Sequence, residues 1–210
     1  RHYTGTTDGE PMYLVSWVRN NGNNSWQMQT GSMTQVPEAN LTSFEVADLD
    51  SDGDLDVVTG AAGTLNGQFG GVNSSLRVYT NNGRGSFTVN TLLSVGGGFF
   101  DAFANKSRYI TDIELADLDG DGDLDILMAQ ARATSRLAWL PNNGNGNFGE
   151  VQVIWARANS QPQSLDSGDL DGDGDTDIAF IAGSGATGIL GGGAEPRINS
   201  ARNPGGGISQ

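Results

Sequence analysis

The sequence predicts an all-β protein built from repeated four-stranded antiparallel sheets. Three observations lead to this prediction: a nine-residue acidic string that occurs three times, an Asn-Gly turn that occurs three times, and short apolar runs on both sides of each copy. Gly accounts for 32 of the 210 residues, and Gly and Asn are typical of tight turns between strands. A repeat of about 60 residues indicates an array of similar units.

The acidic strings have an aspartate at positions 1, 3, 5, 7 and 9 and a glycine at position 6. Five carboxylates so close together repel one another unless a cation lies among them. Several hard oxygen donors on a tight turn suit Ca²⁺ better than Mg²⁺ or a transition metal. The sequence therefore predicts about three calcium sites. The strings are Asp48–Asp56, Asp117–Asp125 and Asp169–Asp177.

The apolar runs predict where the strands lie. Each acidic string lies between two runs, strands A and B, and each Asn-Gly turn lies between two more, strands C and D. Asn-Gly between strand-like runs is a strong hairpin signal. The expected A–B pairs are 44–47 with 57–59, 113–116 with 126–129, and 165–168 with 178–181. The expected C–D pairs are 12–18 with 26–30, 76–80 with 87–93, and 136–140 with 148–155.

In chain order these strands read C–D, A–B–C–D, A–B–C–D, A–B. The strands amount to about three four-stranded sheets, arranged as two complete sheets with a two-stranded half-sheet at each end. Four antiparallel strands in about 60 residues match a β-propeller blade, but closed propellers typically need about 4–8 blades. The chain is then a fragment, or chains associate by completing each other's half-blades, or the blades stack openly. Residues 1–182 are assigned to blades and 183–210 to a Gly-rich irregular tail, with a ragged strand near 187–190 as the alternative.

Composition excludes several classes of protein. The formal net charge is −14, and the acidic strings alone hold 15 aspartates, so the acidity is local. No basic patch indicates nucleic-acid binding, and no apolar run reaches the ~18 residues of a membrane span. Without cysteine, disulfides and thiolate metal sites are excluded. The single histidine, His2, builds no catalytic set, so we expect the protein not to be an enzyme.

The acidic strings also allow two other interpretations, an EF-hand loop and a surface turn without metal. An EF-hand loop begins in the same way but needs a glutamate at position 12, where this chain has Thr59, Met128 and Phe180. Surface turns without metal also favour Asp and Gly. However, turn formation does not require five alternating aspartates in three separate copies, so metal binding is favoured. A structural role is expected, because a site filled by protein oxygens leaves little open coordination.

The motifs also resemble a known family. Residues 46–62 resemble the FG-GAP repeat of integrin α-subunit propellers, and residues 116–148 resemble the related FG-GAP-like (VCBS) repeats of secreted proteins. The resemblance covers residues 12–182 and implies a β-propeller with Ca²⁺ in each A–B loop. It implies side-chain ligands at positions 1, 3, 5 and 9 and a backbone carbonyl at position 7. The implied sites are Asp48, Asp50, Asp52, Asp56 and the carbonyl of Asp54; Asp117, Asp119, Asp121, Asp125 and the carbonyl of Asp123; and Asp169, Asp171, Asp173, Asp177 and the carbonyl of Asp175.

Two insertions in the first complete repeat indicate a second functional surface. Residues 65–73 extend the B–C connection, and residues 96–106 follow strand D. Because antiparallel strands alternate in direction, both insertions lie at the end of the sheet opposite the acidic strings. Binding commonly occurs on loops held by a rigid scaffold. The alternative is that the phenylalanines of the second insertion form a small apolar cluster under that loop. The candidate ligand contacts are Phe99, Phe100, Phe103 and Lys106.

The function predicted from these features is an extracellular, calcium-stabilised β-propeller module for adhesion, recognition or assembly. Its partner would be a protein or a glycan, and its half-blades allow self-association. Extracellular calcium is high enough to fill weak sites. A glycan-binding lectin, the propeller part of a polysaccharide-degrading enzyme and a filament-forming subunit remain open as alternatives.

Overall fold

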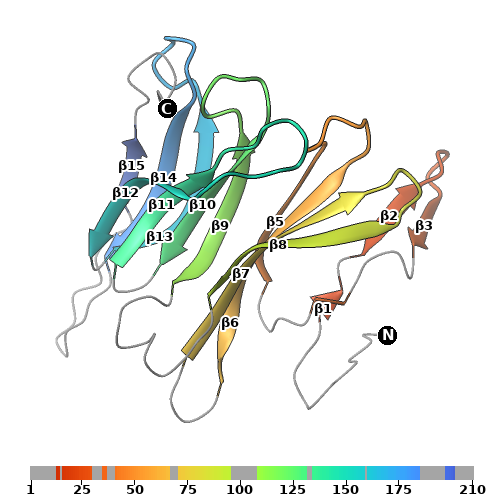
Figure 1. The fold of residues 1–210 in the computed structure, drawn as a ribbon, viewed down its shortest axis with the longest axis horizontal. Coiled ribbons are helices and arrows are strands. Elements are labelled where there is room, and N and C mark those ends of the chain that lie inside the picture. The colour runs from red at the N-terminus through yellow and green to blue at the C-terminus, as the bar shows by residue number, and fades with distance from the viewer. Residues whose placement is uncertain are drawn as a thin grey trace.

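The computed structural model describes residues 13–14, 16–29, 35–36, 41–66, 71–95, 108–131, 134–158, 160–184 and 197–201. Every regular element in these ranges is a β-strand, so the prediction of an all-β fold is confirmed. The described part of the chain has no helix of a length and hydropathy that could cross a membrane. Figure 1 shows the strands gathered into separate twisted sheets.

The first complete sheet has the predicted A–B–C–D order, and each strand pairs antiparallel with the next. Its B and C strands are longer than predicted, because the B–C insertion continues the pairing as far as Asn66 and Gly71. Part of the predicted insertion is therefore a hairpin extension. The strands are β5 (Leu41–Ala47), β6 (Asp56–Asn66), β7 (Gly71–Asn81) and β8 (Phe87–Val95).

The second complete sheet repeats this order and is antiparallel throughout. Its A strand begins earlier than predicted. Its D strand begins later, because Phe148 forms only an isolated bridge with Asn142. The strands are β9 (Tyr109–Ala116), β10 (Asp125–Ala131), β11 (Thr134–Leu140) and β12 (Gln152–Ala158).

The third sheet contains the last predicted A–B pair and one strand that the sequence did not predict. The pair is β13 (Ser160–Gly168) and β14 (Asp177–Ser184), and β15 (Arg197–Ala201) pairs antiparallel with β14. β15 lies within the range predicted as an irregular tail, and that prediction is wrong for these five residues because they pair with the free edge of β14. The alternative strand near 187–190 lies outside the described residues.

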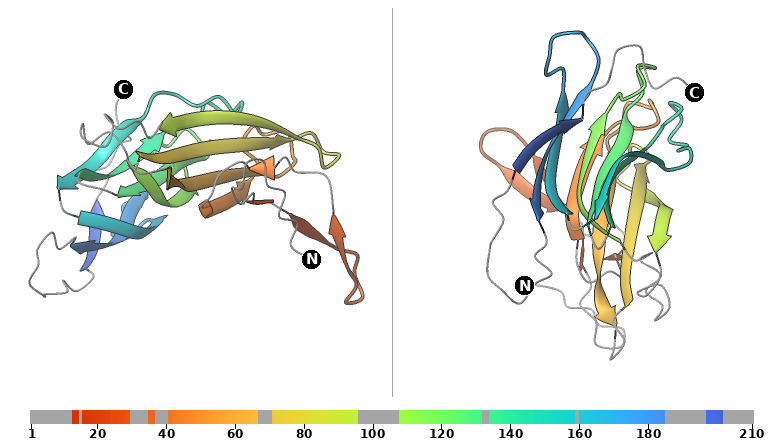
Figure 2. Two further views of the ribbon diagram at one scale, coloured as in Figure 1. Left: turned by 90° about the horizontal axis from the view of Figure 1, so that it is seen from below. Right: turned by 90° about the vertical axis from the view of Figure 1, so that its left-hand side faces the viewer.

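The first predicted C–D pair forms a separate hairpin of β2 (Trp17–Asn20) and β3 (Trp26–Gln29). The run predicted as one strand over 12–18 is divided, because β1 (Tyr13–Leu14) pairs instead with β4 (Gln35–Val36). In Figures 1 and 2 the β2–β3 hairpin lies beside the first complete sheet, on the side away from the second sheet.

The core lies between the sheets, which stack face to face (Figure 2). Strand β10 shows the arrangement most clearly, because side chains alternate between the two faces of a strand. Ile126 and Met128 belong to the cluster shared with the first sheet, and Leu127 and Ala129 belong to the cluster shared with the third sheet. Every residue of β10 is buried, so the central sheet has no solvent-facing side along this strand.

Candidate metal centres

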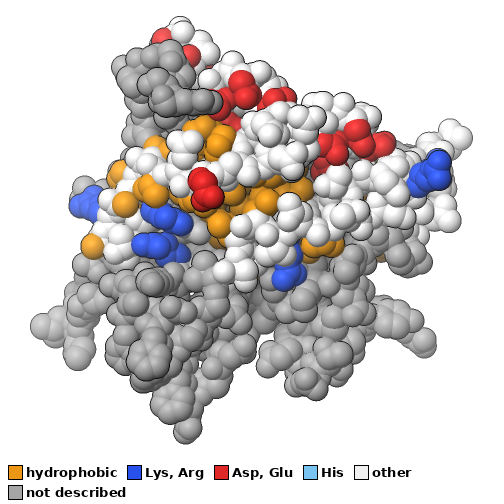
Figure 3. All heavy atoms as spheres, viewed as in Figure 1, with side chains coloured by type: hydrophobic (Ala, Val, Ile, Leu, Met, Phe, Trp, Pro, Cys, Tyr) orange, Lys and Arg blue, Asp and Glu red, His pale blue; other side chains and the backbone are white. Residues whose placement is uncertain are grey.

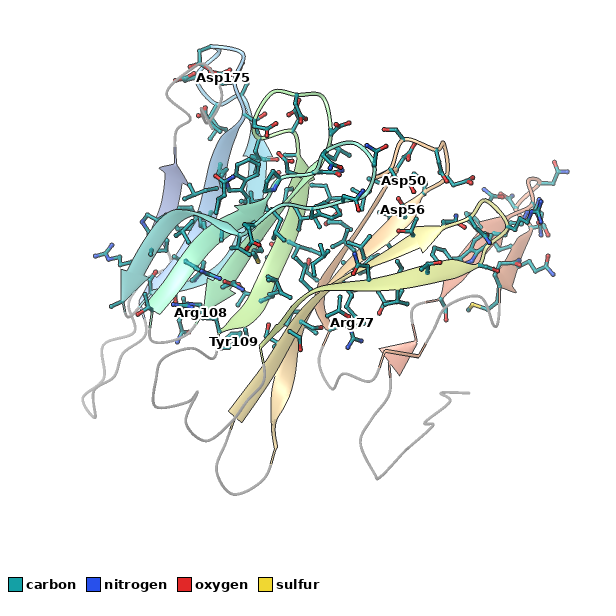
Figure 4. The ribbon with its side chains drawn as sticks, viewed as in Figure 1. Asp50, Asp56, Arg77, Arg108, Tyr109 and Asp175 are labelled. Atoms are coloured by element: carbon teal, nitrogen blue, oxygen red, sulfur yellow. The ribbon has the colours of Figure 1, made fainter. Side chains whose placement is uncertain are left out.

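The three acidic strings form the A–B loops of the three sheets. They connect β5 to β6, β9 to β10 and β13 to β14. Figure 4 shows the labelled residues Asp50 and Asp175 at one end of the sheets and Arg77, Arg108 and Tyr109 toward the other end. All three predicted sites therefore lie at the same end of the molecule.

In each loop, carboxylate oxygens from positions 1, 3 and 9 lie within 4.8 Å of one another. The aspartate at position 9 is buried in all three loops. This spacing allows a single cation to contact all three carboxylates. The three groups are Asp48, Asp50 and Asp56; Asp117, Asp119 and Asp125; and Asp169, Asp171 and Asp177.

The carboxylate at position 1 fixes the course of the loop by accepting backbone N–H groups. In the second loop, Asp117 accepts from Gly120 at 2.8 Å and from Gly122 at 3.0 Å. Asp169 accepts from Gly172 and Gly174, and Asp48 accepts from Asp52 and Gly53. The glycine at position 6 has φ of 91°, 94° and 93° in the three loops, a region that a residue with a Cβ rarely adopts.

The carboxylate at position 9 lies at the base of the loop and joins it to the C–D turn. Asp125 accepts the N–H of Leu118 at 2.9 Å and the N–H of Asn142 at 2.7 Å. Burial raises the pKa of Asp125 to about 6, although both N–H groups act to lower it. Burial likewise raises the pKa of Asp56. A charge of opposite sign among the carboxylates would favour their ionised forms.

The aspartate at position 3 supplies the observation that bears most directly on metal binding. Oδ1 of Asp50 is buried and has no hydrogen-bond partner. A buried carboxylate oxygen without a partner is costly unless a cation or proton satisfies it. In the second loop, burial raises the pKa of Asp119, and the charge of Asp121 raises it further. These oxygen-only donor sets fit a hard cation such as Ca²⁺.

Positions 5 and 7 do not join the three-oxygen groups. The carboxylates at position 5 instead accept the backbone N–H of position 7, with Asp54, Asp123 and Asp175 as donors. The predicted roles of the position 5 side chains Asp52, Asp121 and Asp173 and of the position 7 carbonyls therefore remain predictions. At position 7, the Asp54 and Asp123 carboxylates lie so close to Gly83 and Gly144 that a Cβ on either glycine would overlap them.

The asparagine that opens the C–D turn in each of the two complete sheets has a role that sequence reasoning missed. Nδ2 of Asn81 donates to the carbonyl of Leu55 at 3.2 Å. Nδ2 of Asn142 donates to the carbonyl of Leu124 at 3.1 Å and to that of Leu49, in the acidic loop of the preceding sheet, at 2.8 Å. The signal available in the sequence was that an Asn-rich turn accompanies the acidic string in both complete repeats. The predicted ligand-contact residues Phe99, Phe100, Phe103 and Lys106 lie outside the described residues.

Comparison with known protein families supports the repeated unit that the sequence and the sheets show. The family model of the FG-GAP-like repeat matches residues 67–128 and 117–180, and the matched region spans more than half of the chain. No curated protein matches the chain. The second match contains the whole second acidic loop, and both matches include strands of the stacked sheets. The chain therefore belongs to the FG-GAP-like repeat family.

Proposed function

We propose that this protein is an extracellular β-propeller-type module whose acidic loops bind Ca²⁺ as a structural ion, and that the rigid scaffold serves recognition or adhesion. The observation that carries the proposal is the convergence of three carboxylates in each loop, together with the buried and unpartnered Oδ1 of Asp50. Bound Ca²⁺ would neutralise this charge. Ca²⁺ modules outside the cell operate with dissociation constants of about 10⁻⁴–10⁻³ M, which supports an extracellular location.

The residues themselves hold the loops ready for a cation. Position 1 carboxylates fix the loop backbone, and in the two complete sheets position 9 carboxylates tie the loop base to the C–D turn. Asp50 belongs to the first group and has an unpartnered oxygen. A cation that binds only this arrangement stabilises the folded state, because binding energy becomes folding energy. The loops are therefore proposed to lock the A–B hairpins of all three sheets.

The first test measures thermal unfolding in excess EDTA and in excess Ca²⁺. We expect a higher Tm with Ca²⁺, and we expect Asp50→Asn to reduce that gain because it removes the charge from the unpartnered position. Asp166→Asn is the matched control, since Asp166 is an exposed aspartate on β13 outside the loops. An unchanged Tm on addition of Ca²⁺, or equal effects of the two substitutions, would contradict the calcium proposal.

A second observation supports recognition at the opposite end of the sheets. Arg108 and Arg136 are both half-buried, and their guanidinium groups are close enough to affect each other. Burial lowers the pKa of Arg136, and the positive charge of Arg108 lowers it further. Nε of Arg108 donates to the carbonyl of Thr134, and Nε of Arg136 donates to Oε1 of Gln130. Both partners are neutral. In Figure 3 most acidic side chains lie along the upper edge and most Lys and Arg side chains lie below them.

Two adjacent guanidinium groups held by neutral acceptors suit a ligand that carries a carboxylate or sulfate group. The test is binding to acidic and neutral oligosaccharides on a glycan array. We expect retention of acidic oligosaccharides, weakened about tenfold or more by Arg136→Gln because a charge-assisted contact is lost. Arg157→Gln, at an exposed arginine on β12, is the control. Binding that is equally strong for neutral sugars, or that is unaffected by Arg136→Gln, would contradict an anionic ligand.

A further inference from the structure

The sheets have two different faces, and the repeat allows their residues to be compared one by one. We call the face toward the preceding sheet the leading face and the face toward the following sheet the trailing face. In the second sheet, Ile113 and Ile126 lie on the leading face, in the core shared with the first sheet. Leu118 and Leu127 lie on the trailing face, in the core shared with the third sheet.

Within the chain these faces meet twice, and the same repeat positions are buried each time. The leucine at position 2 of the acidic loop lies on the trailing face, and it is 2% exposed as Leu49 and 4% exposed as Leu118. The residue four places before the loop lies on the leading face, and it is 1% exposed as Ile113 and 6% exposed as Leu165. The two interfaces are thus built by the same pattern.

On the two outer sheets, the corresponding loop leucine and A-strand residues are exposed, whereas Val57 and Tyr79, on the leading face of β6 and β7, are 5% and 1% exposed and form a small core of their own. Leu170, the third loop's leucine at position 2, is 58% exposed on the trailing face of the third sheet. Phe44, the residue four places before the first loop, is 62% exposed on the leading face of the first sheet, and Val46 beside it is 46% exposed. Large apolar side chains at positions built for burial indicate a surface that receives a partner.

From this equivalence we infer that the trailing face of the third sheet in one copy of the chain packs on the leading face of the first sheet in a second copy. The partner is a second copy because one chain carries both an exposed trailing face and an exposed part of a leading face. Within the chain, a trailing face already packs on a leading face twice, between the first and second sheets and between the second and third sheets. The contact is between faces, since the edge of β14 that strand exchange would use is paired with β15.

This contact would be heterologous, because the two faces carry different residues. A head-to-tail contact of this kind closes into a ring when the rotation permits and otherwise extends into an open chain of subunits. The β2–β3 hairpin lies on the side of the first sheet away from the second sheet (Figure 1), which is the side of its leading face, and Phe44 is 62% exposed there. The proposed contact therefore uses β5, the A strand of the first sheet, on which Phe44 and Val46 remain exposed.

The test determines the mass of the 210-residue chain in Ca²⁺ by sedimentation equilibrium over a range of concentrations. We expect a mass above the 21.9 kDa of one chain. We expect Phe44→Asp and Leu170→Asp to be monomeric under the same conditions, because each variant loses one face. Circular dichroism and the Tm of each variant establish that it is folded. Val153→Asp is the matched control, at a 53% exposed valine on the outer strand β12, and it should associate like the parent chain.

Mixing the two variants distinguishes a head-to-tail contact from other kinds of association. Phe44→Asp retains an intact trailing face and Leu170→Asp retains an intact leading face, so the mixture should form a complex of one chain of each. A monomeric parent chain would overturn the inference. Association that both variants retain, or a mixture that stays monomeric, would also overturn it. A two-chain ring and a mass that grows with concentration both support it.

Discussion

At the scale of single residues, five aspartates in a nine-residue loop divide their tasks by position. Position 1 accepts backbone N–H groups, and position 9 is buried and, in the two complete sheets, joins the loop to the neighbouring turn. Position 3 leaves an unpartnered oxygen in the first loop, at Asp50. Position 5 caps the backbone N–H of position 7. A loop that contains so much like charge has several backbone N–H groups paired with its own carboxylates before any cation binds. This preorganisation limits the ordering that binding requires.

The raised carboxyl pKa values predict opposite pH dependences for the metal-free and calcium-bound protein. The folded pKa of Asp125 is about 6, above its usual 3.8, so between these values the folded state holds a proton that the unfolded chain has released. Metal-free stability should therefore increase as the pH is lowered through about 6. The pKa values of Glu45 and Glu114, raised mainly by burial, act in the same direction.

Stabilisation by calcium should instead weaken on acidification, because the ligands must be ionised to bind metal. Thermal unfolding at several pH values between about 4.5 and 7, with and without Ca²⁺, measures both trends. Asp125→Asn should reduce the pH dependence of the metal-free protein. A metal-free Tm that falls steadily as the pH is lowered from 7 to about 5 would contradict the assignment.

At the scale of elements, the repeat was enough to predict the A–B and C–D hairpins, because turn residues and flanking apolar runs occur together in each copy. The sequence did not predict strand ends: β9 starts at Tyr109 because pairing with β10 continues past the apolar run that marked it. It also missed β15, whose residues lack a strand pattern and which forms only by pairing with β14. Long-range pairing of this kind has no local signal.

The metal loops show the same limit. The alternation of aspartates predicted a cation site in each loop, and the family resemblance implied side-chain ligands at positions 1, 3, 5 and 9. The structure brings together the carboxylates at positions 1, 3 and 9. The contribution of Asn142 could not be read from its hairpin motif, because it donates to carbonyls in two loops from different sheets. A contact between separate repeats depends on how the sheets stack rather than on the residues near it in the chain.

Replacing Asn142 with alanine should therefore destabilise the protein more than replacing its neighbour. The Asn142→Ala change leaves the carbonyls of Leu49 and Leu124 without their side-chain donor, and Asn142 is 2% exposed. A loss of about 1–3 kcal/mol in the free energy of unfolding is expected for buried groups left unsatisfied. Asn143→Ala is the control, since Asn143 is exposed and its hydrogen bonds to the described part of the chain stay within its own turn. Equal losses in urea unfolding would show that the turn alone, and not the link between loops, accounts for the effect.

At the scale of the whole molecule, one aspartate joins the A strands of all three sheets, β5, β9 and β13, which we call the inner strands. Asp112 on β9 accepts from Oγ of Ser43 on β5 at 2.8 Å and from Oγ of Ser164 on β13 at 3.2 Å. It also accepts the N–H of Leu165 at 3.1 Å. These three side chains occupy the same repeat position, five residues before each acidic loop. The repeat therefore places polar contacts along the inner strands, while the apolar cores hold the sheet faces together.

The spacing between the first and second sheets is set by a glycine. A Cβ on Gly60 of β6 would lie 2.7 Å from Cγ2 of Ile110 and 3.3 Å from Cγ2 of Ile113, both of them buried residues of β9. Because neither side chain can retreat into solvent, Gly60→Val must push the sheets apart. We expect a loss of about 1–3 kcal/mol in the free energy of unfolding, the usual cost of overpacking a core.

Gly168→Val is the matched control for this substitution. Gly168 is also a strand glycine, on β13, and a Cβ there would meet nothing within 4 Å. Urea unfolding in saturating Ca²⁺ compares the two variants, so that any change reflects packing between the sheets and not loss of metal. If Gly60→Val were as stable as Gly168→Val, the first and second sheets could not lie as close together as they do at Gly60. The face-to-face stacking that forms their shared core would then be wrong.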